Sequence, residues 1–362
     1  MSRMLGEYFE GSVLLLENLI LALKELGLRV LSYKLEGDLP VIGEVSRLSD
    51  LLIDYTDIQS PGSYRLAKEV KGVFRHTQYS PKHLLHYPTQ VVYEISDDFE
   101  IVRTKDDFPP SVLFGIKPCD LAAIEVLDKV LERDDVYQAR RARIEYIVVE
   151  ECVEPGGTCF CGSIGTGPAV SKGYDIAYAR LGDQVLFKVG SEKGLKLVER
   201  VGITPASEET LRMYDEALNE ARKEASRIPP FNVVVRALED VAAAEGFWRE
   251  ASARCVGCTN CNMVCPTCFC TEFNDYADLS GKAWRDRHWF GCLSFTYGQV
   301  AGQHFRPELF MRYRHFVLHK FLFYQKQVGL PGCVGCGRCI TWCPMGIDLK
   351  EVVSRAVGYA GR

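Results

Sequence analysis

Two copies of one cysteine pattern constrain this chain more than any other feature of its sequence. Each copy spaces four cysteines as Cys-x-x-Cys-x-x-Cys-x-x-x-Cys and places a proline directly after the last one. The first copy is Cys255, Cys258, Cys261 and Cys265 before Pro266, and the second is Cys333, Cys336, Cys339 and Cys343 before Pro344. Thiolates this close together suit the corners of an iron–sulfur cubane, and the proline turns the chain away from it. The sequence therefore predicts two [4Fe-4S] clusters.

The fourth cysteine of each copy is predicted to bind the cluster of the other copy. In two-cluster ferredoxins, the cysteine before the proline ligates the neighbouring cluster. This rule assigns one cluster to Cys255, Cys258, Cys261 and Cys343, and the other to Cys333, Cys336, Cys339 and Cys265. Because exchanged ligands would hold the clusters side by side, we expect a short path for electrons between them.

Structural zinc and disulfides are the competing interpretations of these cysteines. Zinc sites usually pair two Cys-x-x-Cys knuckles on separate hairpins, which differs from four ligands within eleven residues. The cysteine count of 15 is odd, a chain of 362 residues does not need covalent staples, and no secretory leader opens the sequence. We therefore favour iron–sulfur clusters in a protein of the reducing cytoplasm.

Composition indicates a protein that neither enters membranes nor binds nucleic acid. No stretch reaches the roughly 20 apolar residues of a membrane helix, and the net charge is −5. The basic stretch 303–327 is an exception, with Glu308 as its single acid. It is either a solvated helix face or a set of cations that would favour reduction of a nearby anionic cluster. Both interpretations stay open.

Hydrophobic periodicity predicts an α/β fold for the first part of the chain. A strand at 112–116, a helix at 121–131 capped by Asp120 and a strand at 144–149 form a parallel crossover unit. Further predicted elements are a helix at 12–28, strands at 29–35 and 91–95, a hairpin of 175–181 with 184–189, and a charged helix at 208–228.

A second group of cysteines follows the strands of this crossover unit. Cys119 and Cys152 lie just after the carboxyl ends of two predicted neighbouring strands, where ligands gather on open parallel sheets. The glycine-rich loop that follows adds Cys159 and Cys161. We hypothesise a third [4Fe-4S] cluster on Cys119, Cys152, Cys159 and Cys161, with zinc or reduced thiols as the alternatives. The glycines at 162–167 are in the reverse order of a dinucleotide fingerprint, so we reject a nucleotide site there.

The expected fold class is α+β, with a boundary near the paired prolines at 229–230. An N-terminal α/β domain with a partly parallel sheet spans residues 1–237, and a mostly helical two-cluster ferredoxin domain spans residues 238–362. A strand-like segment at 233–235 adjoins the boundary, and a long helix is predicted at 309–327.

Cys268, Cys270 and Cys292 are three thiols, one short of a cubane quartet. We interpret them as packed groups beside the clusters, with cluster ligation as the rival interpretation.

Several motifs together resemble one family of redox subunits. They are Lys-Pro-Cys-Asp at 117–120, the cysteine loop 152–161, Gly-Thr-Gly-Pro at 165–168, Cys-Pro-Thr-Cys-Phe-Cys at 265–270 and the cysteine run 333–344. The chain resembles the beta subunit of cytoplasmic hydrogenase/sulfur reductase (sulfhydrogenase), and anaerobic sulfite reductase contains a similar subunit. Cys268, Cys270 and Cys292 also match the pattern of the family.

The resemblance implies a complex of four subunits. A [NiFe] hydrogenase pair, one small and one large subunit, would react with hydrogen, and a flavin diaphorase subunit would react with NAD(P)H. This chain would then be a non-catalytic electron-transfer subunit that carries single electrons between them through its clusters. The alternatives are an electron-transfer subunit of an anaerobic sulfite reductase, a subunit that itself reduces sulfur or polysulfide at an iron–sulfur site among Cys119 to Cys161, and a redox sensor.

Overall fold

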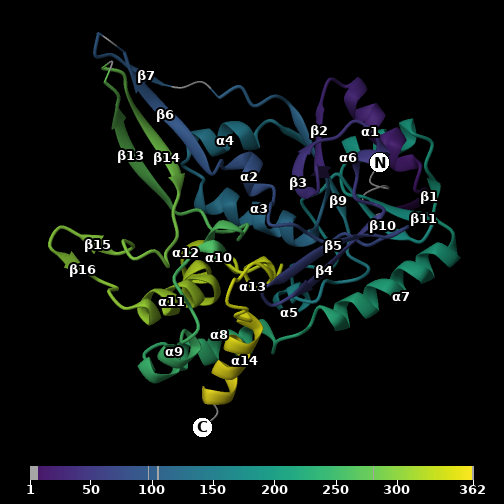
Figure 1. Cartoon of the computed structure of the whole chain (residues 1–362). Coiled ribbons are helices and arrows are strands. Elements are labelled where there is room, and N and C mark those ends of the chain that lie inside the picture. The colour runs from purple at the N-terminus through teal and green to yellow at the C-terminus, as the bar shows by residue number, and fades with distance from the viewer. Residues whose placement is uncertain (1–6, 97, 104–105, 280, 361–362) are drawn as a thin grey trace.

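A large mixed sheet organises the first part of the molecule. The computed structural model describes residues 7–96, 98–103, 106–279 and 281–360. Its largest sheet has the strand order β12-β1-β11-β10-β9-β8-β2-β3, in which β10, β9, β8 and β2 run parallel. The outer strands pair antiparallel. The partly parallel sheet expected from the sequence is confirmed, and the cysteine-rich second part packs beside it (Figure 1).

The strands are β1 (Tyr8–Ser12), β2 (Arg29–Glu36), β3 (Leu39–Glu44), β4 (Tyr55–Ser60), β5 (Ser63–Lys68), β6 (Thr89–Ile95), β7 (Ile101–Arg103), β8 (Ser111–Ile116), β9 (Ile144–Glu150), β10 (Ile176–Leu181), β11 (Gln184–Val189), β12 (Thr204–Pro205), β13 (Thr271–Ala277), β14 (Ala283–Trp289), β15 (Gln299–Val300) and β16 (Gln303–His304). The helices are α1 (Leu15–Glu25), α2 (Lys82–Leu85), α3 (Pro118–Val130), α4 (Asp135–Arg141), α5 (Cys161–Ile164), α6 (Glu192–Arg200), α7 (Glu208–Glu224), α8 (Phe231–Asp240), α9 (Glu245–Ala251), α10 (Asn260–Met263), α11 (Leu309–Leu318), α12 (Tyr324–Val328), α13 (Arg338–Thr341) and α14 (Leu349–Ala360). Two shorter segments are the 3-10 turn η1 (Leu48–Asp50) and the π-helical turn η2 (His319–Phe323).

Strand β8 shows why the sheet forms here. All six of its residues are buried, because helices cover both faces of the sheet at this point. Val112 and Phe114 pack in the core beneath α1, whereas Leu113 and Ile116 pack in the core beneath α3. A run of β-branched and aromatic residues without polar alternation is typical of such a doubly covered parallel strand.

Helix α3 begins at Pro118, three residues earlier than predicted. Its N-cap is Lys117, and Asp120 lies at the third helical position, where its carboxylate accepts the Lys117 backbone N–H at 3.2 Å. Asp120 therefore satisfies a free backbone donor at the helix start, as expected of a cap, but from inside the helix. The second carboxylate oxygen of Asp120 accepts a hydrogen bond from Arg338, which is distant in the sequence.

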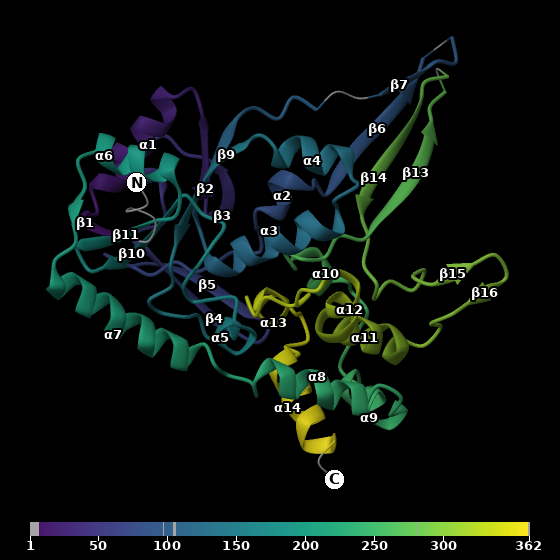
Figure 2. The ribbon, with the colours of Figure 1, turned by 180° about the vertical axis from the view of Figure 1, so that it is seen from behind.

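A four-stranded sheet, β13-β14-β6-β7, joins the two halves of the sequence. Strand β14 pairs antiparallel with β6, although β6 belongs to the first third of the chain. We call this sheet the arm, because it projects from the body in both views (Figures 1 and 2). The second part of the chain is therefore less helical than expected, since β13 and β14 lie in the insert between the two cysteine runs.

The segment 233–235, expected as a strand, lies in helix α8. Val234 and Leu238 of this helix pack with Val352 and Val353 of α14 in one core. The predicted boundary after residue 237 thus falls inside α8, and the division into two domains stays a prediction. No helix among the described residues combines the length and apolar character needed to cross a bilayer.

Acidification should weaken the base of the arm through His86. Its side chain is fully buried and neither ring nitrogen has a hydrogen-bond partner among the described residues. Burial, then the nearby charges of Arg287 and Lys82, lowers the pKa of His86 to about 3 from 6.5. The unfolded chain therefore takes up the proton first, so this contribution to stability is complete above pH 6.5 and is lost as the pH falls toward 3. Between pH 8 and pH 5 the loss should be about 2 kcal/mol.

The variant His86→Leu removes the titrating ring. Its free energy of unfolding should therefore differ between pH 8 and pH 5 by about 2 kcal/mol less than that of the wild type. Guanidinium unfolding of both proteins at pH 8 and pH 5 measures it. An unchanged difference between the two pH values would mean that His86 does not titrate on unfolding.

Candidate iron-sulfur site

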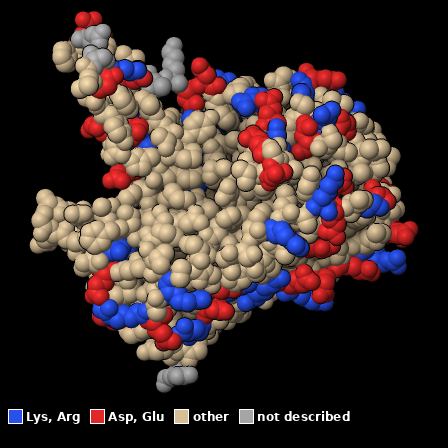
Figure 3. Space-filling view, viewed as in Figure 1, with Lys and Arg blue, Asp and Glu red and all other residues tan. Residues whose placement is uncertain are grey.

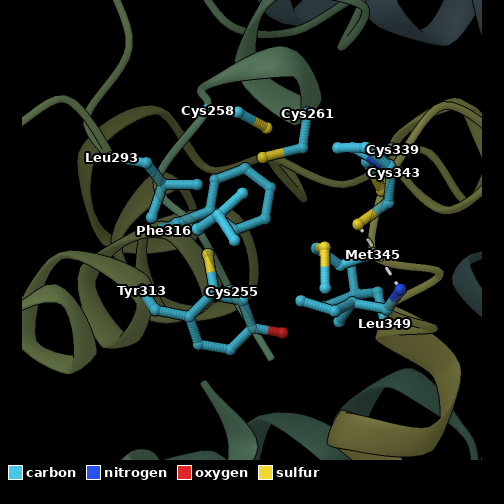
Figure 4. Close-up of a pocket in the computed structure, with 13 residues that line it drawn as sticks. Cys255, Cys258, Cys261, Leu293, Tyr313, Phe316, Cys339, Cys343, Met345 and Leu349 are labelled. Atoms are coloured by element: carbon cyan, nitrogen blue, oxygen red, sulfur yellow. Dashed lines mark hydrogen bonds between the residues drawn. The ribbon is translucent and has the colours of Figure 1, made fainter. Parts of the chain in front are cut away.

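The first predicted quartet surrounds one cavity. Cys255, Cys258, Cys261 and Cys343 line it together, although Cys343 belongs to the second cysteine run. Figure 4 shows sulfurs from both runs directed into this space. The remaining wall is apolar and includes Leu293, Tyr313, Phe316 and Ile347, and the Ile347 backbone N–H donates to the Cys343 sulfur at 3.4 Å.

The second predicted quartet surrounds a separate cavity. Cys333, Cys336 and Cys339 line it with Cys265, which belongs to the first cysteine run. The Gly335 backbone N–H donates to the Cys333 sulfur at 3.4 Å. Each cavity therefore gathers three cysteines of one run and the last cysteine of the other, and Cys339 also lines the first cavity.

The two cavities share a wall. Cys339, Phe316 and Leu349 line both of them. The thiols surround space instead of meeting at a point: among the described residues, no three His, Cys, Asp or Glu side chains lie close enough to hold a single metal ion. A cubane with a ligand at each of its four corners suits this arrangement, and two cubanes would lie next to each other.

Burial favours the protonated form of the Cys333 and Cys261 thiols unless a positive core binds them. It raises the pKa of the Cys333 thiol to about 12, and it raises that of Cys261 well above its ordinary value of 9.0. Because iron binds the thiolate, assembly of each cluster would release protons to solvent. The apolar walls then limit the water that reaches the sulfurs, a property that tunes the reduction potential of such clusters.

Glycines allow the cysteine loop of the first part to pack directly on the second run. The Phe160 backbone N–H donates to the Gly335 carbonyl at 2.8 Å. Gly335 has a φ of +63°, and a Cβ there would lie 2.6 Å from the Cys161 backbone. Only glycine combines this left-handed conformation with so close an approach.

The variant Gly335→Ala should be destabilised by more than its backbone conformation alone predicts. Left-handed strain costs roughly 1–2 kcal/mol, and overpacking against Cys161 adds about 1–3 kcal/mol. Gly329→Ala is the matched control, because Gly329 has a φ of +74° and open space around its Cβ position. Unfolding free energies and iron content of both variants test this. Equal losses of stability would contradict the role of the close approach.

The cysteines of the third hypothetical cluster lie against the second quartet. Cys119 packs with Cys336 in one small core, and the Cys159 thiol lies 3.7 Å from the Cys336 carbonyl oxygen. Burial raises the pKa of Cys161, and the nearby charges of Cys159 and Cys152 raise it further. Strands β8 and β9 are parallel neighbours, and Cys119 and Cys152 follow their carboxyl ends, as expected.

Two inward-facing cations near Cys265 were not identified as site residues from the sequence. Lys320, in the basic stretch, is buried and donates to the Thr267 hydroxyl at 2.8 Å. Lys82 is equally buried and lies 3.5 Å from the centre of the Trp289 ring. Because Lys320 is buried, the interpretation of the basic stretch as a solvated helix face does not hold at this residue, and its place near a cluster stays a prediction. For Lys82, the first residue of the short helix α2, no pattern in the sequence indicates burial.

Comparison with known proteins identifies the cysteine-rich region and the family of the chain. Residues 254–347 match the model of the 4Fe-4S dicluster domain. The chain is 34% identical over 319 residues to the protein named sulfhydrogenase 2 subunit beta of Pyrococcus furiosus, an alignment that covers 85% of this chain and 93% of that protein. The chain belongs to the sulfhydrogenase beta-subunit family. It is thus an iron–sulfur protein of the hydrogenase-related oxidoreductases with two [4Fe-4S] clusters. No solved structure matches it.

Proposed function

We propose that this chain relays electrons, one at a time, between a flavin subunit that reacts with NAD(P)H and a [NiFe] hydrogenase of small and large subunits. The observation that carries this proposal is the pair of adjoining cavities, each lined by one complete predicted quartet. The ligands we propose are Cys255, Cys258, Cys261 and Cys343 for one cluster, and Cys333, Cys336, Cys339 and Cys265 for the other. The printed name of the relative, a sulfhydrogenase subunit, supports hydrogenase and sulfur-reducing partners.

A third cluster on Cys119, Cys152, Cys159 and Cys161 would extend the chain of redox centres. The contact of Cys119 with Cys336 would put it beside the second cluster. At the opposite end, Cys258 is exposed at the rim of the first cavity. Electrons would therefore enter near one end of the series and leave near the other, with no acid, base or nucleophile needed from the protein.

The surface supports assembly with partner subunits. Figure 3 shows charged side chains gathered over the large sheet and along the lower edge of one face, with few between the arm and that edge. Around the β15–β16 hairpin, Phe295, Val300 and Phe305 are exposed. Exposed apolar side chains that gather in this way are typical of protein interfaces. We place the resulting complex in the cytoplasm.

Reconstitution tests the proposal. The purified full-length chain, loaded with iron and sulfide, should pass electrons from a reduced flavoprotein diaphorase to a redox dye and should not reduce polysulfide by itself. Polysulfide reduction by the chain alone would instead favour a catalytic sulfur-reducing subunit. Electron transfer only when a siroheme sulfite reductase is the acceptor would favour the sulfite reductase alternative.

A further inference from the structure

Three cysteines outside the proposed ligand sets gather at the base of the arm. Cys270 directly precedes β13, and Cys292 follows β14 closely. The hairpin brings the two segments together, because the Phe290 backbone N–H donates to the Cys270 carbonyl at 2.9 Å. Cys268 lies two residues before Cys270, and its backbone N–H donates to the Cys265 carbonyl at 3.3 Å. Three thiols from two separate segments therefore share one region.

A buried amide lies among these sulfurs. Asn262, which is 2% exposed, directs its side-chain N–H₂ group to the Cys292 sulfur at 3.3 Å and to the Cys268 sulfur at 3.7 Å. Its side-chain oxygen is buried without a hydrogen-bond partner in the part of the chain described. Gly291 lets the segment that carries Cys292 pass close to Asn262, because a Cβ on Gly291 would lie 2.7 Å from the Thr259 side chain. Amide donors to ligand sulfurs are one of the means by which proteins tune iron–sulfur clusters.

Two buried ammonium groups flank the same thiols. The charges of Cys268, Cys265 and Cys270 act on Lys82, and those of Cys265 and Cys268 act on Lys320. Lys82 donates to the Met263 carbonyl at 3.1 Å, and Lys320 donates to the Thr267 hydroxyl at 2.8 Å. A buried cation is costly unless an anion compensates it. Cys265, a proposed ligand of the second cluster, also lies near both lysines, so the compensating negative charge would come from that cluster together with the thiolates of this group.

We propose that Cys268, Cys270 and Cys292 bind a further [4Fe-4S] cluster through three of its irons. With two ferric and two ferrous ions, four sulfides and three thiolates, this unit carries a net charge of −1 when oxidised and −2 when reduced. An anionic donor on the fourth iron would add one further negative charge, and Lys82 and Lys320 lie close enough to compensate part of the total. The inference is independent of which partners exchange electrons with the chain.

The fourth iron of this cluster has no cysteine left to bind it. Of the 15 cysteines, eight belong to the two quartets and four to the third group, which leaves these three. The fourth iron therefore binds an exchangeable small donor, such as hydrosulfide or an added thiolate. Tyr297 lies on this side, with its ring centre 6.2 Å from that of Phe290, whose backbone N–H donates to the Cys270 carbonyl. Its hydroxyl contacts the His315 ring at 3.0 Å, and His315 and Arg306 line an open pocket.

Removal of two ligands tests the site in the full-length protein. The double variant Cys270→Ala/Cys292→Ala, purified without oxygen, should contain about four fewer irons and four fewer sulfides per chain than the wild type. The EPR signal of one cluster should disappear while the others persist. Ser294→Ala, two residues after Cys292 and not a proposed ligand, is the matched control and should keep the full iron content. Unchanged iron in the double variant, or zinc in place of iron, would overturn the proposal.

Oxidation of the wild type gives a test that does not depend on folding of the variant. One equivalent of ferricyanide should accept one electron while one Fe²⁺ leaves the corner without a cysteine, which converts [4Fe-4S]²⁺ to [3Fe-4S]⁺. Added Fe²⁺ and a reductant should reverse the change. The variant Cys119→Ala should lose the third cluster yet keep this response. Absence of a three-iron EPR signal in the wild type would also overturn the site. Dye reduction tests the proposed electron relay. It is measured separately, because its failure would not count against the cluster on Cys268, Cys270 and Cys292.

Discussion

Replacing Cys343 with alanine should eliminate the cluster of the first cysteine run and leave that of the second. Cys343 belongs to the second run, but it lines the cavity of Cys255, Cys258 and Cys261. Electron transfer to dye should fall to background, because a relay with a missing centre has no short path. Cys258→Ala should produce the same residual EPR spectrum, since it removes a ligand of the same cluster.

The reciprocal pair makes this test decisive. Cys265 lines the cavity of the second quartet, so Cys265→Ala and Cys333→Ala should share a different residual spectrum. Redox titration of the remaining cluster in each of the four variants provides an independent comparison of potentials. If Cys343→Ala matched Cys333→Ala instead, each run would bind its own cluster and the crossed assignment would be wrong.

Replacing Arg338 with methionine should destabilise the protein by about 3–5 kcal/mol, the cost of leaving a buried charge without its partner. Arg338 and Asp120 are both fully buried, and they form an ion pair of 2.8 Å between α13 and α3. Arg338 also donates to the Tyr33 hydroxyl at 3.1 Å and to the Thr77 carbonyl at 2.8 Å. It therefore connects the dicluster region with three segments of the first part of the chain.

Arg355→Met is the matched control for this prediction. Arg355 pairs with Glu250 at the surface, where both side chains are largely exposed, so its loss should change stability by less than about 1 kcal/mol. In the double variant Asp120→Asn/Arg338→Met, the charge left by the first substitution is removed, and the total loss should be smaller than the sum of the single losses. Anaerobic unfolding in guanidinium of the wild type, Asp120→Asn, Arg338→Met, the double variant and Arg355→Met measures these losses. Additive losses would mean that the pair is not coupled.

Local patterns predicted the parts of this molecule that depend on neighbours in the sequence. The cysteine runs indicated two cubane sites, because their spacing by itself brings three thiols together. The strand, helix and strand around Cys119 were predicted with their parallel pairing, since β8 and its helix carry clear hydrophobic signals. The predicted long helix at 309–327 is present as α11, η2 and α12, with a π-helical turn that contains Lys320.

Features built by distant segments were not predicted. Nothing local to β6 indicates that it pairs with β14, because both strands carry mixed polar and apolar residues and their register comes from tertiary packing. Burial of Lys82 depends on Trp289 and Cys268, which lie far along the chain. Asp120 was predicted only as a local cap, since its ion pair with Arg338 is a contact between the two parts of the protein.

The pairing of β6 with β14 also has a consequence for biosynthesis. At about 5–20 residues per second, the ribosome finishes β14 on the order of ten seconds or more after β6 has emerged. During that interval the nascent chain carries a strand with one unsatisfied edge, which is prone to aggregation. Both cysteine runs also emerge in the later portion. Iron delivery and completion of the arm therefore have to wait until β14 and both cysteine runs have been synthesised.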